Sequence, residues 1–264
     1  MNIVMMYKYG LLLGFFFIVF QACLRPVDGC VHPRAKDFNP EADRNTTCDF
    51  YDIYYDFEHI YSDSTVMTDS MLIIDKDNNQ YFIDQLQFFL FQSHLSKSDA
   101  SSFSSISDIT YQENGSTKYL EDNIALFSFR QNSAQACDWT HLGTFDSLDF
   151  QIGIPSTIQE YNFVGLDASH EFNTSSPLYD QNRLVSARIV LIDAISNDTV
   201  EVLTDYFLPY KTSINRTVAD GMDLRLNCQL NYDSLLYNIS IPNDASSLIG
   251  QSIIQNIHNS LTIE

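Results

Sequence analysis

The sequence predicts an all-β fold, an antiparallel β sandwich with one C-terminal amphipathic helix. The aromatic content supports this prediction, because the rings of 15 Tyr and 19 Phe pack well on pleated sheets. The stretch QLQFFLFQSHL, residues 85–95, has apolar side chains on both faces of one strand: Leu86, Phe88 and Leu90 on one, Phe89 and Phe91 on the other. Such a strand lies inside a sheet that a second layer covers. The rest of the chain is a series of short alternating segments separated by turn residues.

Residues 1–22 are expected to be a signal peptide. Lys8 precedes the apolar run GLLLGFFFIVF, which is too short for an anchor helix. Ala22 directly before Cys23 is typical of bacterial lipoprotein processing, which would attach a lipid to Cys23 and tether the protein to a membrane. The alternative is ordinary signal cleavage with Cys23 discarded. In either case we expect the folded part to be exported to the cell envelope, on the periplasmic or the surface side.

The cysteine count agrees with export. Five cysteines are an odd number for an exported protein, and removing Cys23 leaves four, which can pair fully. Pairing near with near and far with far is the simplest of three connectivities, and the candidates are Cys30, Cys48, Cys137 and Cys228. No two of them form a C-x-x-C pair, so a structural zinc site has little support.

Two regions follow the signal peptide. Residues 23–49 are polar, contain three prolines and show no periodicity, so we expect a tether. Residues 50–264 show no break in composition and are expected to form one sandwich domain. Its first strand, FYDIYYDFEHIY, alternates, with His59 on the aromatic, core-facing side and Asp52, Asp56 and Glu58 on the other.

Further strands are expected along the chain. VMTDSMLIID forms the second, and DKDNN, residues 75–79, resembles the start of a calcium loop but reads as a turn, since it lacks the later Gly and Glu. Five more are NIALFSF, TFDSLDFQIGI, RLVSARIVLI, TVEVLTDYFL and MDLRLNCQL. At the end, the apolar spacing changes to that of a helix with Ser246 or Asp244 as N-cap; its expected apolar face is Leu248, Ile249, Ile253, Ile254, Ile257 and Leu261.

Charge and motifs exclude some functions. The formal net charge of -20 repels phosphate backbones, so a nucleic-acid partner is not expected. We find no nucleophile elbow, H-E-x-x-H motif or glycine-rich phosphate loop in the sequence. The chain is therefore not expected to be an enzyme. No protein partner is indicated by the sequence.

Histidines and methionines are the candidate metal ligands. His59 on a core-facing position is either a copper ligand or a buried, hydrogen-bonded histidine. His94, His141 and His170 are further candidates, although no two histidines have a tight metal-binding spacing. Met67, Met71 and Met222 add thioether sulfur, which suits Cu(I) but is usually found in packing.

Several segments together resemble the MbnP-like family of exported copper-binding proteins associated with methanobactin systems. They are FEHIYSDSTVMTDSMLIIDKDNNQYFIDQLQFFL, DNIALFSFRQNSAQAC, LGTFDSLDFQIGIP, SPLY and SIIQNIHNSLTI, which cover most of residues 50–263. The resemblance implies the sandwich fold for residues 50–264. It also implies copper as cofactor, with His59 as the residue that matches a family ligand.

The sequence departs from the family after SPLY, where the two tryptophans of the family pattern are missing. In the family, copper binding involves histidines and a tryptophan that a dihaem partner enzyme oxidises to kynurenine, and Trp139 lies outside those motifs. Two functions therefore stay open. One is a membrane-tethered lipoprotein that binds copper weakly at His59, with His94 or His170 as added donors. The other is a metal-free sandwich that acts as a binding or structural surface protein.

Overall fold

The computed structural model describes residues 26–62, 65–66, 72–103, 105–139, 141–219 and 221–264. The signal peptide and Cys23 lie outside these residues, so the prediction of lipidation stays a prediction. In the part of the chain that is described, no helix has the length and apolar character needed to cross a membrane. The chain divides into two compact units, residues 1–50 and 51–264.

The first unit has a structure of its own within the segment expected to be a tether. Two short parallel strands, β1 (Asp28–Gly29) and β2 (Arg44–Asn45), lie side by side. A disulfide joins Cys30 to Cys48, with an S–S distance of 2.00 Å, and the Cys30 side chain is buried. The predicted pairing of these two cysteines is thus confirmed, and it closes a loop that otherwise has little apolar packing.

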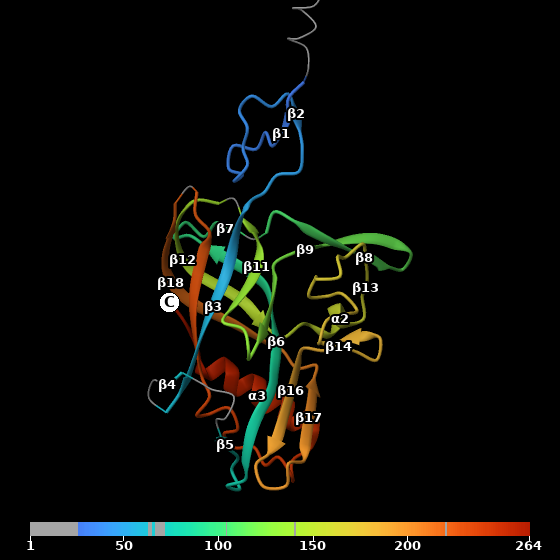
Figure 1. The fold of residues 1–264 in the computed structure, drawn as a ribbon, viewed down its shortest axis with the longest axis vertical. Helices are drawn as coiled ribbons and strands as arrows, with labels where there is room; N and C mark the ends of the chain where they lie inside the picture. The colour runs from blue at the N-terminus through green and yellow to red at the C-terminus, as the bar shows by residue number, and fades with distance from the viewer. Residues whose placement is uncertain (1–25, 63–64, 67–71, 104, 140, 220) are drawn as a thin grey trace, which may run out of the picture. The chain divides into compact units, whose positions relative to one another are not determined.

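The second unit contains the predicted sandwich, whose larger sheet has eight strands (Figure 1). The central strand is β6 (Gln80–Ser96), which contains the whole stretch QLQFFLFQSHL. On one side β6 pairs with β16 and β12, and on the other with β5, β10 and β7. The bounds of these strands are β5 Leu72–Ile74, β7 Ser102–Phe103, β10 Ile124–Ser128, β12 Gly143–Ile152, β16 Ala187–Asp193, β17 Thr199–Thr204 and β18 Leu208–Val218. β17 and β18 form the outer ends of the row.

The second sheet has five strands in the order β11, β3, β19, β20, with β4 beside β3. Their bounds are β3 Tyr51–Tyr61, β4 Thr65–Val66, β11 Ser133–Trp139, β19 Leu224–Asn231 and β20 Leu261–Ile263. The segment VMTDSMLIID thus contributes two short strands, β4 and β5, to different sheets. One pairing departs from the predicted antiparallel pattern, because β19 runs parallel to β3, with Leu226 opposite Tyr55.

The two faces of β6 contact two different clusters of buried side chains, as its alternation predicts. Leu86, Phe88 and Leu90 belong to the core between the two sheets, where Phe88 stacks on Phe127 with ring centroids 4.3 Å apart. Phe89 and Phe91 belong to a second cluster on the outer face of the larger sheet. All five side chains are fully buried, so the predicted second cover of β6 is confirmed.

A polar layer of short elements makes this second cover. Its elements are β8 (Asp108–Glu113), β9 (Ser116–Glu121), β13 (Asn162–Val164), α2 (Ser156–Gln159), β14 (Tyr179–Asp180) and β15 (Arg183–Leu184). β13, β8 and β9 form a small sheet, and β14 and β15 form a hairpin (Figure 1). The sequence does not predict most of these elements, because they are short and largely exposed on their outer side.

The C-terminal helix α3 (Ser246–Ser260) is confirmed with three corrections. Its apolar face buries Ile249, Ile253, Ile254 and Ile257 in the core between the sheets, while Leu248 is 56% exposed. The N-cap is Ala245, and no side chain caps the helix, so neither Ser246 nor Asp244 has that role. Leu261 lies after the helix, in β20, where it pairs with β19.

The predicted turn at residues 75–79 is formed around the buried carboxylate of Asp75. Its oxygens accept hydrogen bonds from the main-chain N–H of Asp77 and Asn79, both at 2.9 Å, and from the N–H of Ile241 at 3.2 Å. These bonds are the backbone contacts that favour Asp in turns.

A disulfide between Cys137 and Cys228 does not form; both are buried free thiols. Cys137 lies on β11 and Cys228 on β19, and β3 runs between these strands. Strands two apart in a sheet are about 9.5 Å apart, whereas the Cα atoms of a disulfide lie within about 7 Å. Both thiols face the core, and burial raises the pKa of each.

Candidate binding site

His59 lies in the core between the two sheets, with 6% of its surface exposed. Its Nδ1 is 2.7 Å from the Tyr232 hydroxyl, and its ring contacts the rings of Phe127 and Phe129. Nε2 is buried and has no hydrogen-bond partner within the described residues. Burial lowers the pKa of the imidazole, and the nearby main chain of Gln131 opposes this shift only in part. The surroundings of His59 are those of a neutral core histidine.

The two histidines expected to supplement His59 lie elsewhere. His94 is on β6 beside Ser93, whose Oγ accepts a hydrogen bond from Tyr55 at 2.7 Å. His59 is four residues beyond Tyr55 on β3. It therefore lies about 13 Å along the strand from the point where Tyr55 contacts Ser93, the neighbour of His94. His170 contacts Asp122 at 3.2 Å, in a loop outside the sandwich core. The structure therefore does not bring the predicted copper ligands together, and copper does not fit at His59.

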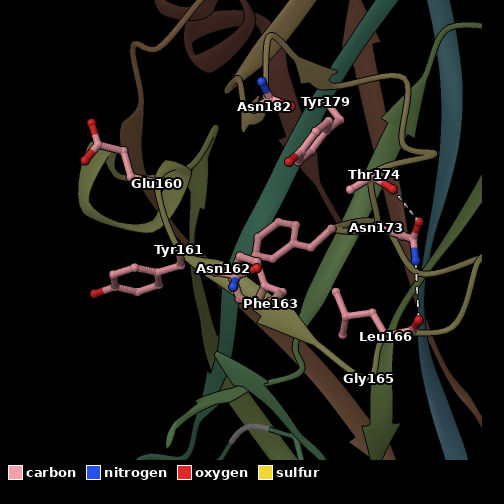
Figure 2. A pocket seen from close by; sticks show the side chains of 11 residues that line it. Glu160, Tyr161, Asn162, Phe163, Gly165, Leu166, Asn173, Thr174, Tyr179 and Asn182 are labelled. Carbon is pink, nitrogen blue, oxygen red and sulfur yellow. Dashed lines mark hydrogen bonds between the residues drawn. The ribbon is translucent and has the colours of Figure 1, made fainter. Parts of the chain in front are cut away.

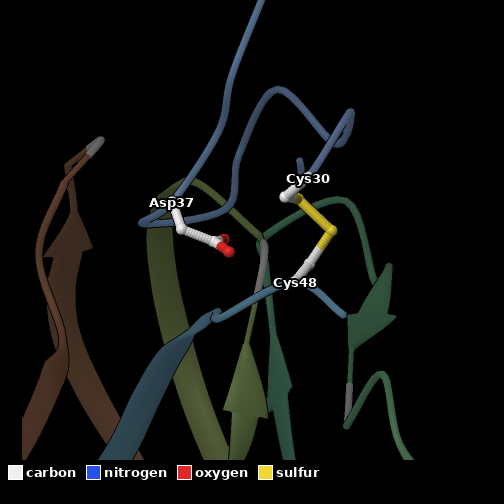
Figure 3. Close-up of side chains that lie close together, drawn as sticks. All are labelled: Cys30, Asp37 and Cys48. Carbon is white, nitrogen blue, oxygen red and sulfur yellow. A yellow bond between two sulfur atoms is a disulfide. The ribbon is translucent and has the colours of Figure 1, made fainter. Parts of the chain in front are cut away.

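One group of three metal-binding residue types lies close together in the described part of the chain: Cys30, Asp37 and Cys48 (Figure 3). Figure 3 shows the Asp37 carboxylate directed toward the two sulfur atoms. The sulfurs are joined in the disulfide, and only a thiolate is a good metal ligand. Asp37 also accepts a hydrogen bond from the N–H of Asp49 at 2.9 Å. In this oxidised state the group does not provide a metal site.

Trp139 and His141 are held by packing contacts and a hydrogen bond to each other. Trp139 is buried, and its Nε1 donates a hydrogen bond to the carbonyl oxygen of His141 at 2.6 Å. The His141 ring packs against Phe103, with centroids 4.4 Å apart. Met222 is 61% exposed, and Met67 and Met71 lie outside the described residues.

A different feature has the character of a binding site, namely a pocket of about 370 Å³ in the polar layer (Figure 2). One wall is formed by residues 160–166, which include β13, and the other by residues 172–174 and the β14–β15 hairpin. Figure 2 shows Tyr179 and Asn182 on the side opposite Asn162 and Phe163. The volume is within the range of about 300–1,000 Å³ for small-molecule sites.

Aromatic rings form the floor of this pocket. Phe172 is buried, and its ring centroid is 5.0 Å from that of Phe163 and 5.1 Å from that of Phe89 on β6. The floor is thus continuous with the second cluster of buried side chains. Beside it, Tyr161 stacks on Tyr111, with centroids 4.0 Å apart and planes inclined by 7°. A ligand in the pocket would contact rigid apolar surface from below.

The rim is polar and offers groups that are free to bind. Within the described residues, no hydrogen-bond partner is found for the Tyr179 hydroxyl, the Asn162 and Asn182 amides or the Glu160 carboxylate. Asn182 is the second residue of the β14–β15 turn, and both turn residues have positive φ, as two-residue hairpin turns require. The turn thus holds one amide at the edge of the pocket.

The loop behind the pocket is held by its own hydrogen bonds. The Asn173 side chain donates to the carbonyl oxygen of Leu166 at 3.3 Å, as Figure 2 shows, and to that of Asp167 at 2.9 Å. Its Oδ1 accepts the N–H of Ser175 at 3.1 Å. The pocket is therefore formed before any ligand binds.

The sequence does not predict this site, because its residues lie in turns and in a three-residue strand. The signal that was present is the alternation of aromatic and amide residues in YNF, residues 161–163, together with the Asn-containing turn at residues 181–182. No spacing rule links these two segments, which are brought together only by the packing of both on β6.

No family model matches the sequence, and no match is found among curated proteins. Among solved structures, the chain is similar to MbnP from Methylosinus trichosporium, with 9% sequence identity and a TM-score of 0.42. The similarity covers 74% of this chain and 82% of MbnP. No residue role is taken from this similarity.

Proposed function

We propose that the protein is an exported, membrane-tethered binding protein without catalytic activity, whose ligand is a neutral saccharide held in the pocket of Figure 2. The observation that carries this proposal is the combination of an aromatic floor with unpartnered amide and hydroxyl groups at the rim. It is the metal-free alternative of the two functions left open by the sequence.

The chemistry of the pocket matches that of a sugar ring. A sugar has apolar C–H faces, which contact aromatic rings, and hydroxyl groups that both donate and accept hydrogen bonds. The amides of Asn162 and Asn182 offer one acceptor and two donor hydrogens each, and the Tyr179 hydroxyl offers both roles. The net charge of -20 and the Glu160 carboxylate disfavour anionic ligands.

Export is supported by the Cys30–Cys48 disulfide, since disulfides persist in oxidising compartments. Tethering rests on the sequence pattern at Cys23. We expect Cys23→Ser to shift the protein from the membrane fraction to the soluble fraction, and no change in this partition would support ordinary signal cleavage.

Copper has no place in the proposed function. The family resemblance points to His59, whose Nδ1 is already in contact with the Tyr232 hydroxyl, and a copper site needs several donors converging on one point. His94 and His170, the further donors considered above, each lie beside a carboxylate, Glu121 at 3.4 Å and Asp122 at 3.2 Å.

Saccharide binding is tested by screening the purified protein on an array of neutral and anionic glycans and by calorimetry of the best neutral ligand. We expect Tyr179→Phe combined with Asn182→Ala to weaken binding by about tenfold or more, the equivalent of about 1.4 kcal/mol or more. The matched control is Tyr119→Phe combined with Asn197→Ala. Tyr119 is 69% exposed, and Asn197 is an exposed turn residue that shares the positive φ of Asn182.

Two outcomes would refute the proposal. One is the absence of binding by any neutral glycan at millimolar concentration. The other is binding that the pocket variant and the control variant affect equally.

A further inference from the structure

β11 is the outer strand of the five-stranded sheet, and a groove runs along its open edge. On its inner side β11 pairs with β3; on its outer side it pairs with no strand that the structure describes. Two cavities, of about 490 and 290 Å³, lie along this edge and share residues of both walls. The shared residues are Gln135, Ser169, His170 and Glu171.

The wall formed by β11 is its main chain. Ser133, Ala134 and Gln135 line the smaller cavity, and residues 135–138 line the larger one. Side chains of consecutive strand residues point to opposite faces, so consecutive residues can line one cavity only where the strand edge itself is exposed. Such an edge presents N–H and C=O groups that can pair with another strand.

The pairing of β11 with its neighbour is irregular at the middle of the groove. Its pairing with β3 shifts between Gln135 and Cys137, as in a β-bulge. This shift separates a first paired stretch, Ser133–Gln135, from a second, Cys137–Trp139, and the two cavities follow these stretches.

The opposite wall is a loop, residues 168–171, that the protein holds in place. His170 Nε2 lies 3.2 Å from the Asp122 carboxylate, and its Nδ1 accepts the N–H of Phe172 at 3.0 Å. The Ser175 hydroxyl donates to the carbonyl oxygen of Ala168 at 2.6 Å. The groove is therefore preformed, with one strand edge facing a fixed loop.

The groove is acidic. Asp122, Asp138, Asp167 and Glu171 line the larger cavity, and no residue that lines either cavity is Lys or Arg. Burial raises the pKa of the Glu171 carboxyl, which means that its charged form is poorly solvated there. A cation brought into the groove would compensate this loss of solvation.

We propose that this groove binds an extended, lysine- or arginine-containing segment of a partner protein, which adds to β11 as a further strand. Main-chain hydrogen bonds to the edge would supply affinity, and alternate basic side chains would face the carboxylates that line the groove. Since β11 has seven residues, the segment has about seven residues as well. None of the residues that line the groove lines the saccharide pocket, so the two sites can be tested separately.

The test uses the exported chain and a capped heptapeptide of alternating lysine and threonine. We expect binding that weakens as salt is added, together with slower amide hydrogen exchange in residues 133–139. The same peptide with N-methyl groups on alternate amides keeps its charge but cannot form the ladder, and the peptide with glutamate in place of lysine tests charge. Both are expected to bind at least about tenfold more weakly.

Protein variants separate the groove from general electrostatics. Asp167→Asn combined with Glu171→Gln should weaken peptide binding by about tenfold, whereas Asp146→Asn combined with Glu113→Gln, which removes the same charge outside the groove, should leave it unchanged. Equal binding of the N-methylated peptide, equal effects of the two double variants, or no binding at millimolar peptide would each overturn the proposal.

Discussion

The contact between His59 and Tyr232 allows the core-histidine interpretation to be tested by substitution. We expect Tyr232→Phe to lower the free energy of unfolding of residues 51–264 by about 1–3 kcal/mol, because it leaves the buried Nδ1 of His59 without its partner at 2.7 Å. Tyr232 is 1% exposed, and removing its hydroxyl changes the volume of the core very little.

His59→Leu leaves the Tyr232 hydroxyl buried without a partner and should cost a similar amount. When both residues are replaced, neither polar group remains, and the orphan Nε2 of His59 is removed as well. Replacing both partners of a buried hydrogen bond by apolar groups can be nearly neutral. The double variant is therefore expected to be less destabilised than the sum of the two single variants, with a coupling energy of about 1–3 kcal/mol.

The assay is guanidinium-induced unfolding at pH 8, followed by far-UV circular dichroism and by the fluorescence of Trp139, which is buried in the fold. Tyr237→Phe serves as the control, because Tyr237 is 66% exposed, and its effect should stay within about 0.5 kcal/mol. Additive effects of the two core substitutions would refute the reasoning. So would tight binding of Cu(I) or Cu(II) that His59→Leu abolishes, since this would make His59 a ligand.

Three further predictions concern pH, the helix and the thiols. The pKa of His59 is lowered in the fold, so below the ordinary value of about 6.5 the unfolded chain binds more protons than the folded one. The free energy of unfolding should therefore be unaffected by His59 above that pH and should decrease as the pH drops below it, by at most about 1.4 kcal/mol per pH unit. His59→Leu should remove this part of the pH dependence. Gly250→Ala should destabilise the protein by about 1–3 kcal/mol despite the better helix propensity of Ala, because the new Cβ would lie 2.5 Å from the Cβ of Thr204. In thermal melting, the lost stability should be recovered when Gly250→Ala is combined with Thr204→Gly. Cys137 and Cys228 should react with a thiol reagent only after unfolding, and fast reaction of either in the native state would contradict their burial.

The sequence predicts those elements whose side chains alternate strongly. β3 and β6 follow directly from the spacing of their aromatic residues, and α3 follows from the change of apolar period near the C-terminus. β9 shows no comparable signal, because STKYLE is mostly exposed and polar. Local sequence patterns also do not predict which strands pair. The parallel contact between β3 and β19 joins segments more than 160 residues apart, and this pairing places Cys228 on the opposite side of β3 from Cys137.

The pocket and the groove could not be predicted for the same reason. Each is formed by loops and strand edges that are far apart in the sequence. They become neighbours only through the packing of the two sheets and of the polar layer around β6. The sequence identifies His59 as core-facing but does not show whether other donors converge on it. That question depends on where the fold places His94, which is on β6, and His170, which is in a loop outside the sandwich core.

The positions of these histidines also show why a histidine count is a poor guide to a metal site in this fold. His94 has Glu121 at 3.4 Å and Asp149 at 3.9 Å, and His170 has Asp122 at 3.2 Å. Asn123 connects this region to the core, because its amide donates to Glu121 and to the carbonyl oxygen of Ser93, both at 3.3 Å. Within the described residues, neither histidine belongs to a group of three side chains close enough together to share one metal ion. His94 and His170 are thus each paired with carboxylates, whereas His59 is paired with the Tyr232 hydroxyl and enclosed by aromatic rings.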